Sequence, residues 1–330
     1  MKIFRLIILL IHLAILGMLL GVLLNAYIPP KVFPWFNLLS LGFPLLMIGY
    51  VLLTFFWIFS WKKRAFVFMF LGLFFLNPVK RWVNYSADKK DTPNLKIITY
   101  NMMGGKLGYD KIQEYIDQQN PDMVFLQENS YQELQFKNLR GNNTLPVLAF
   151  YSKYKILSRK NIFENLNNED ITAQCEVIDL EIKSKTYRVI NAHLGSFGFV
   201  KSMVKLNGES KDDEEKVKNI VKRLIPTFKT HQVQVEMIRK SIDESPYPVI
   251  LAGDLNSVPN SHEYYHLGKG LNDVFFEVGK GSGTSFHDYK YPLRIDYIFT
   301  SPSITPITYH VDRSVKLSDH FPVIATFKLD

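Results

Sequence analysis

The chain has 330 residues, enough for a membrane segment followed by one sizeable domain. Its formal net charge of +8 does not indicate a nucleic-acid-binding surface, because residues 1–84 contain eight Lys and Arg residues and no Asp or Glu. The rest of the chain contains the other 31 of the 39 basic residues and all 31 acidic residues, so it is formally neutral. A single cysteine, Cys175, excludes an internal disulfide.

Three apolar runs in this acid-free segment predict three transmembrane helices, over about residues 6–24, 38–61 and 65–79. The third would reach only about 22 Å and would need local thinning of the bilayer. A cleaved signal peptide is the competing interpretation of the first run, but that run exceeds the usual length and further apolar runs follow it. A polar linker is expected over residues 85–94, and a domain over residues 95–330.

Basic residues beside the apolar runs indicate the side of the membrane on which the domain lies. Lys2 and Arg5 favour a cytoplasmic N-terminus, and the cluster Lys62–Arg64, after two crossings, is again cytoplasmic. A third crossing places the domain outside the cytoplasm, although Lys80 and Arg81 would then lie outside as well. We therefore predict a multi-pass membrane protein with an extracytoplasmic domain. If the third run does not span, the domain faces the cytoplasm.

A strand–helix–strand unit opens the domain. Apolar residues predict buried strands over Leu95–Tyr100 and Met123–Leu126, and helical spacing predicts a helix between them, over Tyr109–Gln119. Asn101 and Glu128 follow the two strands. An amide and a carboxylate at neighbouring strand ends could share a cation. The alternative is that Glu128 is an exposed loop residue.

The middle of the domain adds a histidine at a strand end. Alternating apolar residues predict a hairpin over Cys175–Leu180 and Thr186–Asn191, and the second arm leads to His193. A histidine in this position is more often structural than catalytic. An amphipathic helix is expected over Lys216–Ile242.

A short apolar run, Val249–Leu251, predicts a buried strand that ends at Gly253-Asp254-Leu255-Asn256. A carboxylate and an amide two positions apart are then held at a rigid strand end, within the narrow tolerance that chemistry requires. The alternative is an Asp/Asn turn, which is common after strands.

The last third of the chain places two acidic residues near strands. Arg294 and Asp296 lie in an apolar run, where a charge is costly unless it is paired. Asp319 and His320 directly precede the final strand. A buried carboxylate beside an imidazole orients the ring and favours its charged form.

Together these strand ends offer carboxylates, amides and two histidines. Carboxylate and amide oxygens suit Mg²⁺ better than Zn²⁺, which prefers sulfur and nitrogen ligands. The sequence therefore predicts Mg²⁺ as the cofactor, with Mn²⁺ as an alternative.

Six segments, in chain order, resemble motifs of the endonuclease/exonuclease/phosphatase superfamily, and in particular its membrane-anchored bacterial members. The segments are Tyr100-Asn101, Leu126-Gln127-Glu128, Asn191-Ala192-His193-Leu194, Gly253-Asp254-Leu255-Asn256, Arg294-Ile295-Asp296-Tyr297-Ile298 and Ser318-Asp319-His320-Phe321-Pro322. The resemblance covers residues 95–330 and implies an α/β (α+β) four-layer sandwich, in which two packed mixed β-sheets are flanked by helices. It also implies a bacterial inner membrane as the location.

The resemblance implies where metal and substrate bind. Glu128 is expected to be the principal Mg²⁺ ligand, with Asn101 close to the metal and Asp319 able to reach it. Arg294, in the fifth segment, is a candidate contact for the substrate phosphate.

The resemblance also implies catalytic roles. Asp254 would align or deprotonate the attacking water, and Asn256 would hold that water or a phosphoryl oxygen. His193 and His320 would stabilise charge on the phosphoryl oxygens. Asp296 would orient His320.

These expectations describe a membrane-anchored, Mg²⁺-dependent phosphoesterase or phosphodiesterase that hydrolyses P–O bonds by attack of water. One alternative is an extracytoplasmic nuclease acting on DNA or RNA. Another is an inactive, membrane-tethered binding module, which the intact set of polar residues argues against. The neutral domain and the short linker favour a small or lipid-linked phosphoester over duplex DNA. No protein partner is implied.

Overall fold

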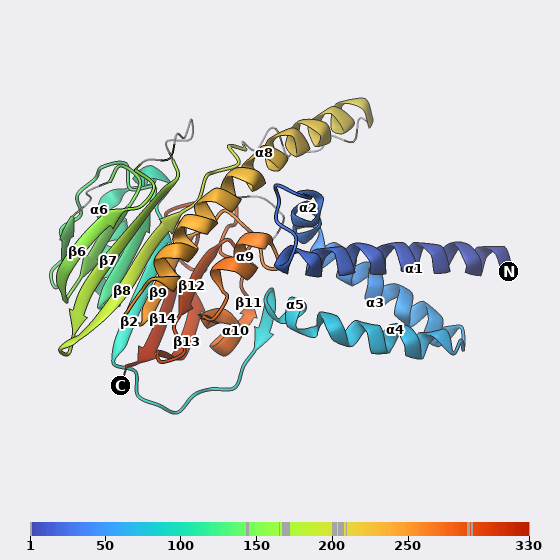
Figure 1. Ribbon diagram of the computed structural model, residues 1–330, viewed down its shortest axis with the longest axis horizontal. Helices are drawn as coiled ribbons and strands as arrows, with labels where there is room; N and C mark the ends of the chain where they lie inside the picture. Colours follow the sequence, from blue (N-terminus) through green and yellow to red (C-terminus); the bar gives the residue numbers. More distant parts are fainter. Residues whose placement is uncertain are drawn as a thin grey trace.

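Two six-stranded sheets pack face to face, with helices on their outer faces (Figure 1). The computed structural model describes residues 2–142, 145–164, 166, 172–199, 203, 208, 210–288, 291 and 293–329. Both sheets contain parallel and antiparallel neighbours. The prediction of two mixed sheets flanked by helices is therefore confirmed.

The first sheet has the strand order β13-β14-β2-β3-β5-β4. These strands are, in the same order, Thr305–Val311, Val323–Lys328, Leu95–Asn101, Met123–Gln127, Ala149–Ser152 and Arg140–Asn142. β2 and β3 are parallel because helix α6 (Tyr109–Gln119) carries the chain back between them. Ile112 and Ile116 of α6 pack on the outer face of this sheet.

The second sheet has the strand order β10-β12-β9-β8-β7-β6. These strands are Asn272–Asp273, Asp296–Thr300, Val249–Asp254, Lys185–His193, Gln174–Ile182 and Lys155–Asn161. β7 and β8 form the predicted hairpin, and the long helix α8 (Ser210–Asp243) connects the parallel strands β8 and β9. Val235 and Ile238 of α8, with α9 (His262–Leu267), cover the outer face. The short helix α10 (Val274–Val278) packs against the core between the sheets.

Strands that are buried on both faces explain the apolar runs in the sequence. Successive side chains of β2 point in opposite directions, so Ile97 packs between the sheets and Ile98 packs against α6. Phe125 of β3 and Ile250 of β9 meet Ile97 in the core between the sheets, and all three are fully buried. This core sets the spacing of the two sheets, and with it the spacing of the strand ends.

The N-terminal segment forms helices that extend away from the sandwich (Figure 1). They are α1 (Lys2–Leu23), η1 (Leu24–Ala26), α2 (Trp35–Leu41), α3 (Phe43–Phe59), α4 (Arg64–Gly72), η2 (Leu73–Phe75) and α5 (Leu76–Lys80). Among the described residues, one helix, Lys2–Ala26, is long and apolar enough to cross a membrane. The pair α2–α3 passes the same test only if its two bent parts count as one span.

Two of the predicted helices are interrupted. The helix expected over residues 38–61 is bent by 71° at Gly42, where α2 ends and α3 begins. Pro44, in the first turn of α3, explains this break because proline lacks the N–H that would continue the preceding helix. The helix expected over residues 65–79 is divided into α4, the 3₁₀ turn η2 and α5.

The N-terminal helices bury a mixed interior and expose apolar side chains. Trp57 Nε1 donates a hydrogen bond to Nδ1 of the buried His12, 3.1 Å away, between α3 and α1. On the outside, Ile3, Phe59 and Phe66 are 76%, 78% and 74% exposed. An apolar exterior around a packed interior is typical of a surface that meets a membrane or another protein.

The chain after α5 is attached to the sandwich. Strand β1 (Val83–Tyr85) pairs antiparallel with β11 (Lys280–Ser282). The buried Asn84 donates from Nδ2 to the carbonyl oxygen of Phe275, 2.7 Å away. Tyr85, the first residue of the predicted linker, therefore lies in a strand, and residues 86–94 connect β1 with β2.

Buried polar contacts dock the N-terminal segment onto α9 and the loop before it. Asn25 donates to the carbonyl oxygen of Asn260 at 3.0 Å, and Arg81 donates to the Asn260 side chain at 2.8 Å. Asn37 of α2 donates to both carboxylate oxygens of Glu263, at 3.1 and 2.9 Å. Asn25, Asn37 and Glu263 are at most 1% exposed.

Glu263 is the buried acidic residue of this interface. Burial raises its pKa, but hydrogen bonds from His231 and Asn37 outweigh burial and lower the pKa from 4.5 to about 2. The His231 ring nitrogen Nδ1 lies 3.0 Å from Glu263 Oε1. The ionised carboxylate therefore stabilises the folded protein.

The depressed pKa predicts how stability depends on pH. The contribution of ionised Glu263 is complete above pH 4.5 and is lost as the pH falls from 4.5 through about 2. We expect Glu263→Gln to lower the melting temperature by roughly 5 °C at about pH 7, and the difference from wild type to shrink at about pH 3. Scanning fluorimetry of both proteins at the two pH values measures this difference. An equal difference at both would contradict the assignment.

Candidate active site

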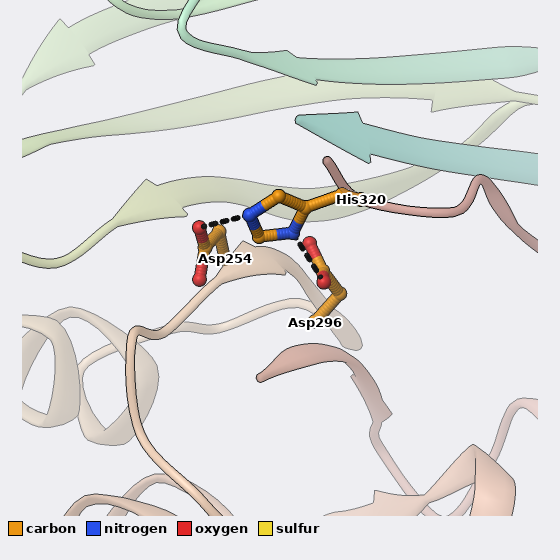
Figure 2. A group of neighbouring side chains, drawn as sticks. All are labelled: Asp254, Asp296 and His320. Carbon is orange, nitrogen blue, oxygen red and sulfur yellow. Dashed lines mark hydrogen bonds and ion pairs between the residues drawn. The ribbon is translucent and has the colours of Figure 1, made fainter. Parts of the chain in front are cut away.

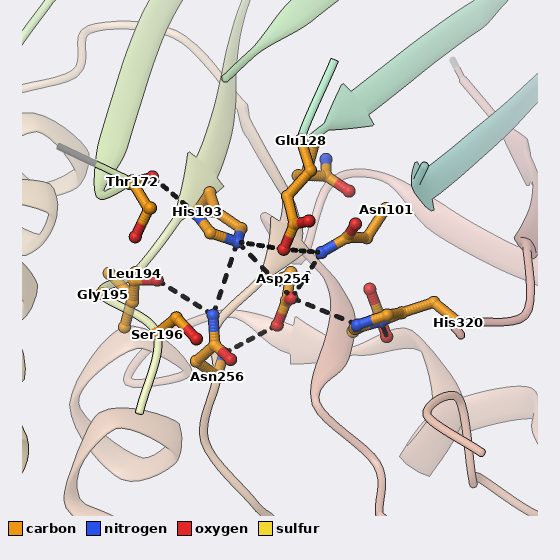
Figure 3. A network of polar contacts seen from close by, with 12 residues as sticks. Asn101, Glu128, Thr172, His193, Leu194, Gly195, Ser196, Asp254, Asn256 and His320 are labelled. Atoms are coloured by element: carbon orange, nitrogen blue, oxygen red, sulfur yellow. Dashed lines mark hydrogen bonds and ion pairs between the residues drawn. The ribbon is translucent and has the colours of Figure 1, made fainter. Parts of the chain in front are cut away.

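Polar side chains from the first sheet reach one edge of the sandwich (Figure 3). Asn101 is the last residue of β2 and is in register with Gln127 at the end of β3, so Glu128 leaves the sheet beside it. β14 runs antiparallel to β2 and begins opposite the end of that strand, which brings His320, just before β14, to the same edge.

The second sheet supplies side chains at the same edge. His193 ends β8 and is in register with Asp254, which ends the parallel strand β9. Asp296 begins β12 and pairs with Asp254 across the antiparallel strands. The register of the strands thus places the imidazole of His193 and the carboxylates of Asp254 and Asp296 next to one another at this edge.

The Asn101 amide joins the two sheets at this edge. Its Nδ2 donates to Glu128 Oε1 at 3.1 Å and to Asp254 Oδ2 at 3.0 Å. His193 Nε2 lies 3.6 Å from the same oxygen of Glu128 and 3.7 Å from that of Asp254. Asn101, His193 and Asp254 are buried, whereas the Glu128 side chain is 40% exposed. Glu128 is therefore the member of this group that solvent and solutes can reach.

Asp254, Asp296 and His320 form a buried row (Figure 2). His320 Nδ1 lies 2.8 Å from Asp296 Oδ2, and His320 Nε2 lies 3.6 Å from Asp254 Oδ2. All three residues are at most 4% exposed. The contact with Asp296 fixes the ring so that its other nitrogen points at Asp254.

Backbone groups orient His193 and Asn256. His193 Nδ1 lies 2.8 Å from the carbonyl oxygen of Thr172, an acceptor, so this nitrogen carries the hydrogen and Nε2 points into the site. Asn256 Nδ2 donates to the carbonyl oxygen of Leu194 at 3.0 Å and lies 3.5 Å from His193 Nε2. The backbone N–H of Asn256 donates to Asp254 Oδ1 at 2.8 Å.

Two site residues have left-handed backbone conformations. The φ angle is +51° at Glu128 and +43° at Asn256, a region that non-glycine residues seldom adopt. The N–H of Gly104 donates to the carbonyl oxygen of Glu128 at 2.8 Å and holds this conformation. Such conformations concentrate at functional sites, where the surrounding structure compensates for their cost.

Burial and neighbouring charges shift the pKa values of the site in opposite directions. Burial raises the pKa of Asp254 to about 6, which makes its carboxylate more basic than usual. Burial lowers the pKa of His320, but Asp296 and Asp254 outweigh burial and raise it to about 10. For Glu128, burial raises the pKa, whereas His193 and Asn101 lower it to about 2. A basic carboxylate thus faces a charged imidazole, an arrangement characteristic of active sites.

The acidic side chains at this edge fit a divalent cation. Asp254 and Asp296 offer carboxylate oxygens within 4.8 Å of each other, and the carboxylate of Glu128 shares the Asn101 amide with Asp254. Among the described residues, Asp296 Oδ1 is buried without a hydrogen-bond partner, an acceptor that a cation would satisfy. Carboxylate oxygens are the ligands that hard divalent cations prefer.

Asp319, a predicted metal ligand, lies at the margin of the site. It is partly buried, and its Oδ1 accepts a hydrogen bond from Ser318 Oγ at 3.1 Å. Its charge raises the pKa of the buried Tyr100, after burial itself. No hydrogen bond in the described part of the chain joins it to Glu128 or Asn101, so its role as a ligand stays a prediction.

Arg294 does not lie where the sequence prediction put it. The residue is 1% exposed, and its Nη1 donates to Asp273 Oδ2 at 2.9 Å. The guanidinium lies 4.5 Å from the ring centroids of both Phe275 and Tyr297. The prediction that Arg294 contacts a substrate phosphate is therefore wrong, because its charge is already paired and enclosed.

Several residues that support the site were not singled out in the sequence. Asn191 of β8 accepts a hydrogen bond from Gln127 at 2.8 Å, and its Nδ2 donates to two carbonyl oxygens of the first sheet. Phe286 lies with its ring centroid 5.0 Å from that of His320. Gln127 and Asn191 lie within the six segments that resemble the family motifs, next to Glu128 and His193. This position in the sequence could have identified them. Phe286 carries no such signal.

Comparison with known families gives two matches. Residues 98–320 match the Endonuclease/Exonuclease/phosphatase family. Residues 4–82 match a family described as a domain of unknown function (DUF8431). No curated protein matches the chain.

Solved structures share the fold of the sandwich. A humanised form of D. rerio TDP2, carrying 14 mutations, has a TM-score of 0.52 at 19% identity, over 71% of this chain and 98% of that one. The human Nocturnin catalytic domain with bound sulfate has a TM-score of 0.51 at 16% identity, over 74% of this chain and 96% of that one. At such low identity these likenesses show the fold alone.

Gly253, one residue before Asp254, leaves no room for a side chain between β9 and β8. Its φ is +145°, and a Cβ there would lie 1.9 Å from the carbonyl oxygen of Ala192. Gly253→Ala must push apart the strands that carry His193 and Asp254. We expect it to lower the free energy of unfolding by at least about 3 kcal/mol, or to prevent folding. Chemical denaturation measures this loss.

Gly270→Ala is the matched control for this substitution. Gly270 also has a positive φ, +74°, but no atom lies within 4 Å of the position of its Cβ. Its substitution should cost only the backbone strain, about 1 kcal/mol. Equal losses in the two variants would show that the close approach to Ala192 is unimportant.

Proposed function

Because the chain belongs to the Endonuclease/Exonuclease/phosphatase family and is a metal-dependent hydrolase of phosphoester bonds, we propose that it is a membrane-anchored phosphoesterase. We further propose that Mg²⁺ is the metal, with Mn²⁺ able to replace it. The observation that carries the proposal is the position of Asp254, buried between the amide of Asn101 and the imidazole of His320. This is the arrangement needed to activate water beside a bound phosphate.

In the proposed reaction, water attacks phosphorus and the bond to the leaving oxygen breaks. Asp254 orients the water and takes its proton, a role suited to a carboxylate whose pKa is raised. The charged His320, held by Asp296, stabilises the negative charge that develops on the phosphoryl oxygens. His193 adds a second donor from the other side of Asp254.

The metal would be held chiefly by Glu128, with Asn101 beside it and Asp319 as a further ligand. The exposed carboxylate of Glu128 supports this assignment. When bound, the cation would polarise a phosphoryl oxygen and neutralise its charge. Asn256, fixed by the carbonyl oxygen of Leu194, would hold the water or a phosphoryl oxygen.

We assign residues 1–84 to a segment that carries the membrane-anchoring helices and the start of β1, 85–94 to a linker whose first residue ends β1, and 95–330 to the catalytic domain. The length of helix Lys2–Ala26 and the apolar exterior of the N-terminal helices support membrane anchoring. Leu16 and Leu19 of α1 are buried in the cluster that α3 and α4 share, which supports a retained helix rather than a cleaved signal. The basic clusters support several crossings of a bacterial inner membrane with the domain outside the cytoplasm.

The proposed substrate is a small or lipid-linked phosphoester. Phe286, in ring contact with His320, belongs to the same apolar cluster as Leu19 and Phe43 of the N-terminal segment. Tyr291 donates a hydrogen bond to the carbonyl oxygen of Leu41 at 2.7 Å. The site therefore lies beside the predicted membrane segment, which supports the lipid-linked alternative. The balanced charge of residues 85–330 argues against tight binding of duplex DNA.

Removing the proposed base tests the mechanism. We expect Asp254→Asn and His320→Ala each to lower the turnover of bis(4-nitrophenyl) phosphate by at least about 100-fold in the full-length protein with Mg²⁺. EDTA should abolish turnover and added Mg²⁺ should restore it. Asp179→Asn is the control, since this carboxylate pairs with Arg188 on β8, and it should change turnover by less than about twofold. Undiminished turnover by Asp254→Asn would refute the assigned base.

A substrate panel tests the proposed class. Full-length protein in phospholipid vesicles is offered the vesicle phospholipid, inositol phosphates, RNA and plasmid DNA, each with Mg²⁺. We expect the phospholipid to be hydrolysed at least about 10-fold faster than DNA, because anchoring raises its effective concentration at the site. Released phosphate or headgroup and nucleic-acid cleavage are measured in parallel. Faster cleavage of DNA or RNA would favour the nuclease alternative, and no hydrolysis would favour a binding module.

A further inference from the structure

A chain of buried hydrogen bonds runs from the N-terminal segment toward the active site. Asn37 of α2 donates to both oxygens of Glu263, and Glu263 Oε1 lies 3.0 Å from His231 Nδ1. The other nitrogen of that ring, Nε2, lies 2.7 Å from the carbonyl oxygen of Gly195. The three side chains come from α2, α9 and α8, and each is at most 1% exposed.

Gly195 belongs to the loop that follows His193. Its N–H donates to Gln234 Oε1 at 3.1 Å, so α8 holds both backbone polar groups of this residue. The preceding residue, Leu194, donates to the carbonyl oxygen of Asp254 at 3.1 Å and accepts from Asn256 at 3.0 Å. Figure 3 shows this loop directly beside His193 and Asn256. A displacement of Gly195 would therefore move groups that contact the proposed base.

Each residue in this chain of hydrogen bonds depends on its neighbour for a hydrogen-bond partner. Both nitrogens of His231 lie within hydrogen-bonding distance of an oxygen, Nδ1 of the Glu263 carboxylate and Nε2 of the Gly195 carbonyl. Glu263 is ionised and fully buried, and its partners among the described residues include Asn37 from outside the sandwich. Removing one partner leaves a buried charge with fewer hydrogen bonds to compensate for its lost hydration.

Attachment alone does not require this arrangement. Apolar side chains already join the N-terminal segment to the sandwich, where Trp82 and Phe75 share a cluster with Val258 and Ile295. Burying a charged group costs desolvation free energy, whereas burying apolar side chains is favourable. The best-attested advantage of a buried charged group is that it specifies one arrangement of its partners. The geometry specified here is that of the backbone next to His193.

We propose that Asn37, Glu263 and His231 are positioning residues, through which docking of the N-terminal segment sets the His193–Asn256 side of the active site. This inference rests on the proposed function, because it assumes that His193 and Asn256 act on the substrate. None of the three residues contacts the site directly. They act through the Leu194–Gly195 backbone.

Asn37→Asp tests the proposal in the full-length protein in detergent micelles. The substitution keeps the shape of the side chain but sets a carboxylate against Glu263. With bis(4-nitrophenyl) phosphate and Mg²⁺ we expect kcat to fall at least about 10-fold and KM to change less than about twofold. The double variant Asn37→Asp/Glu263→Gln exchanges donor and acceptor across the contact and should recover most of kcat.

Asn25→Asp is the matched control. Asn25 is as buried as Asn37 and also donates two hydrogen bonds, but to the carbonyl oxygens of Phe36 and Asn260, neither of which leads to Gly195. We expect its kcat to stay within about twofold of wild type. Equal losses of kcat in the two single variants, or no recovery in the double variant, would overturn the proposal.

Hydrogen–deuterium exchange separates this proposal from the proposed function. We expect the peptide that contains Gly195 to exchange faster in Asn37→Asp than in wild type and in Asn25→Asp. If wild-type protein hydrolyses no phosphoester, the proposed function fails, and the exchange result still decides whether α2 holds the loop. Unchanged exchange at Gly195 would overturn the link itself.

Discussion

The amide of Asn101 is the interaction on which the site depends. Glu128 comes from the first sheet and Asp254 from the second, and two carboxylates held this close repel each other. The Asn101 Nδ2 donates to one oxygen of each, at 3.1 and 3.0 Å, and so makes their approach favourable. This contact exists only while the two sheets keep a fixed separation. The apolar core between the sheets sets that separation. The geometry of the active site therefore depends on the packing of the core.

A second polar contact fixes how the sheets lie on each other. Asn191 projects from β8 into the first sheet, where it accepts from Gln127 and donates to the carbonyl oxygens of Leu126 and Ala149. Apolar side chains tolerate small sliding movements, but a buried amide does not, because a shift would leave its groups unpaired. Glu128 follows Gln127 by one residue, and His193 follows Asn191 by two. The contact between Gln127 and Asn191 therefore fixes the alignment of the two sheets directly beside the active site.

Much of this arrangement is predictable from local sequence. A β-branched apolar run followed by a polar residue marks a strand end, and Asn101, Glu128, His193 and Asp254 all have this signature. The structure brings them together at one edge, and the segment with His320 joins them there.

What local sequence could not reveal are contacts between distant residues. Arg294 stands in an apolar run beside Asp296, and only the position of Asp273 decides that its charge is paired internally. Asn37 in an apolar segment gives no sign of Glu263, which lies 226 residues further along the chain. The break at Gly42 had a local signal in Pro44, but an apolar run suggests continuity more strongly than one proline suggests a bend.

The pairing of β1 with β11 bears on how such an enzyme would meet its substrate. A flexible tether lets a domain sweep through a volume around its anchor. Here β1, which closely follows α5, pairs with β11 in a two-stranded sheet, so the active site keeps one orientation relative to α1. For a protein anchored through α1, encounters would then take place in two dimensions. The rate of hydrolysis would then depend on the number of substrate molecules per unit area of bilayer. A lipid in the opposite leaflet would not reach the active site, however abundant it is.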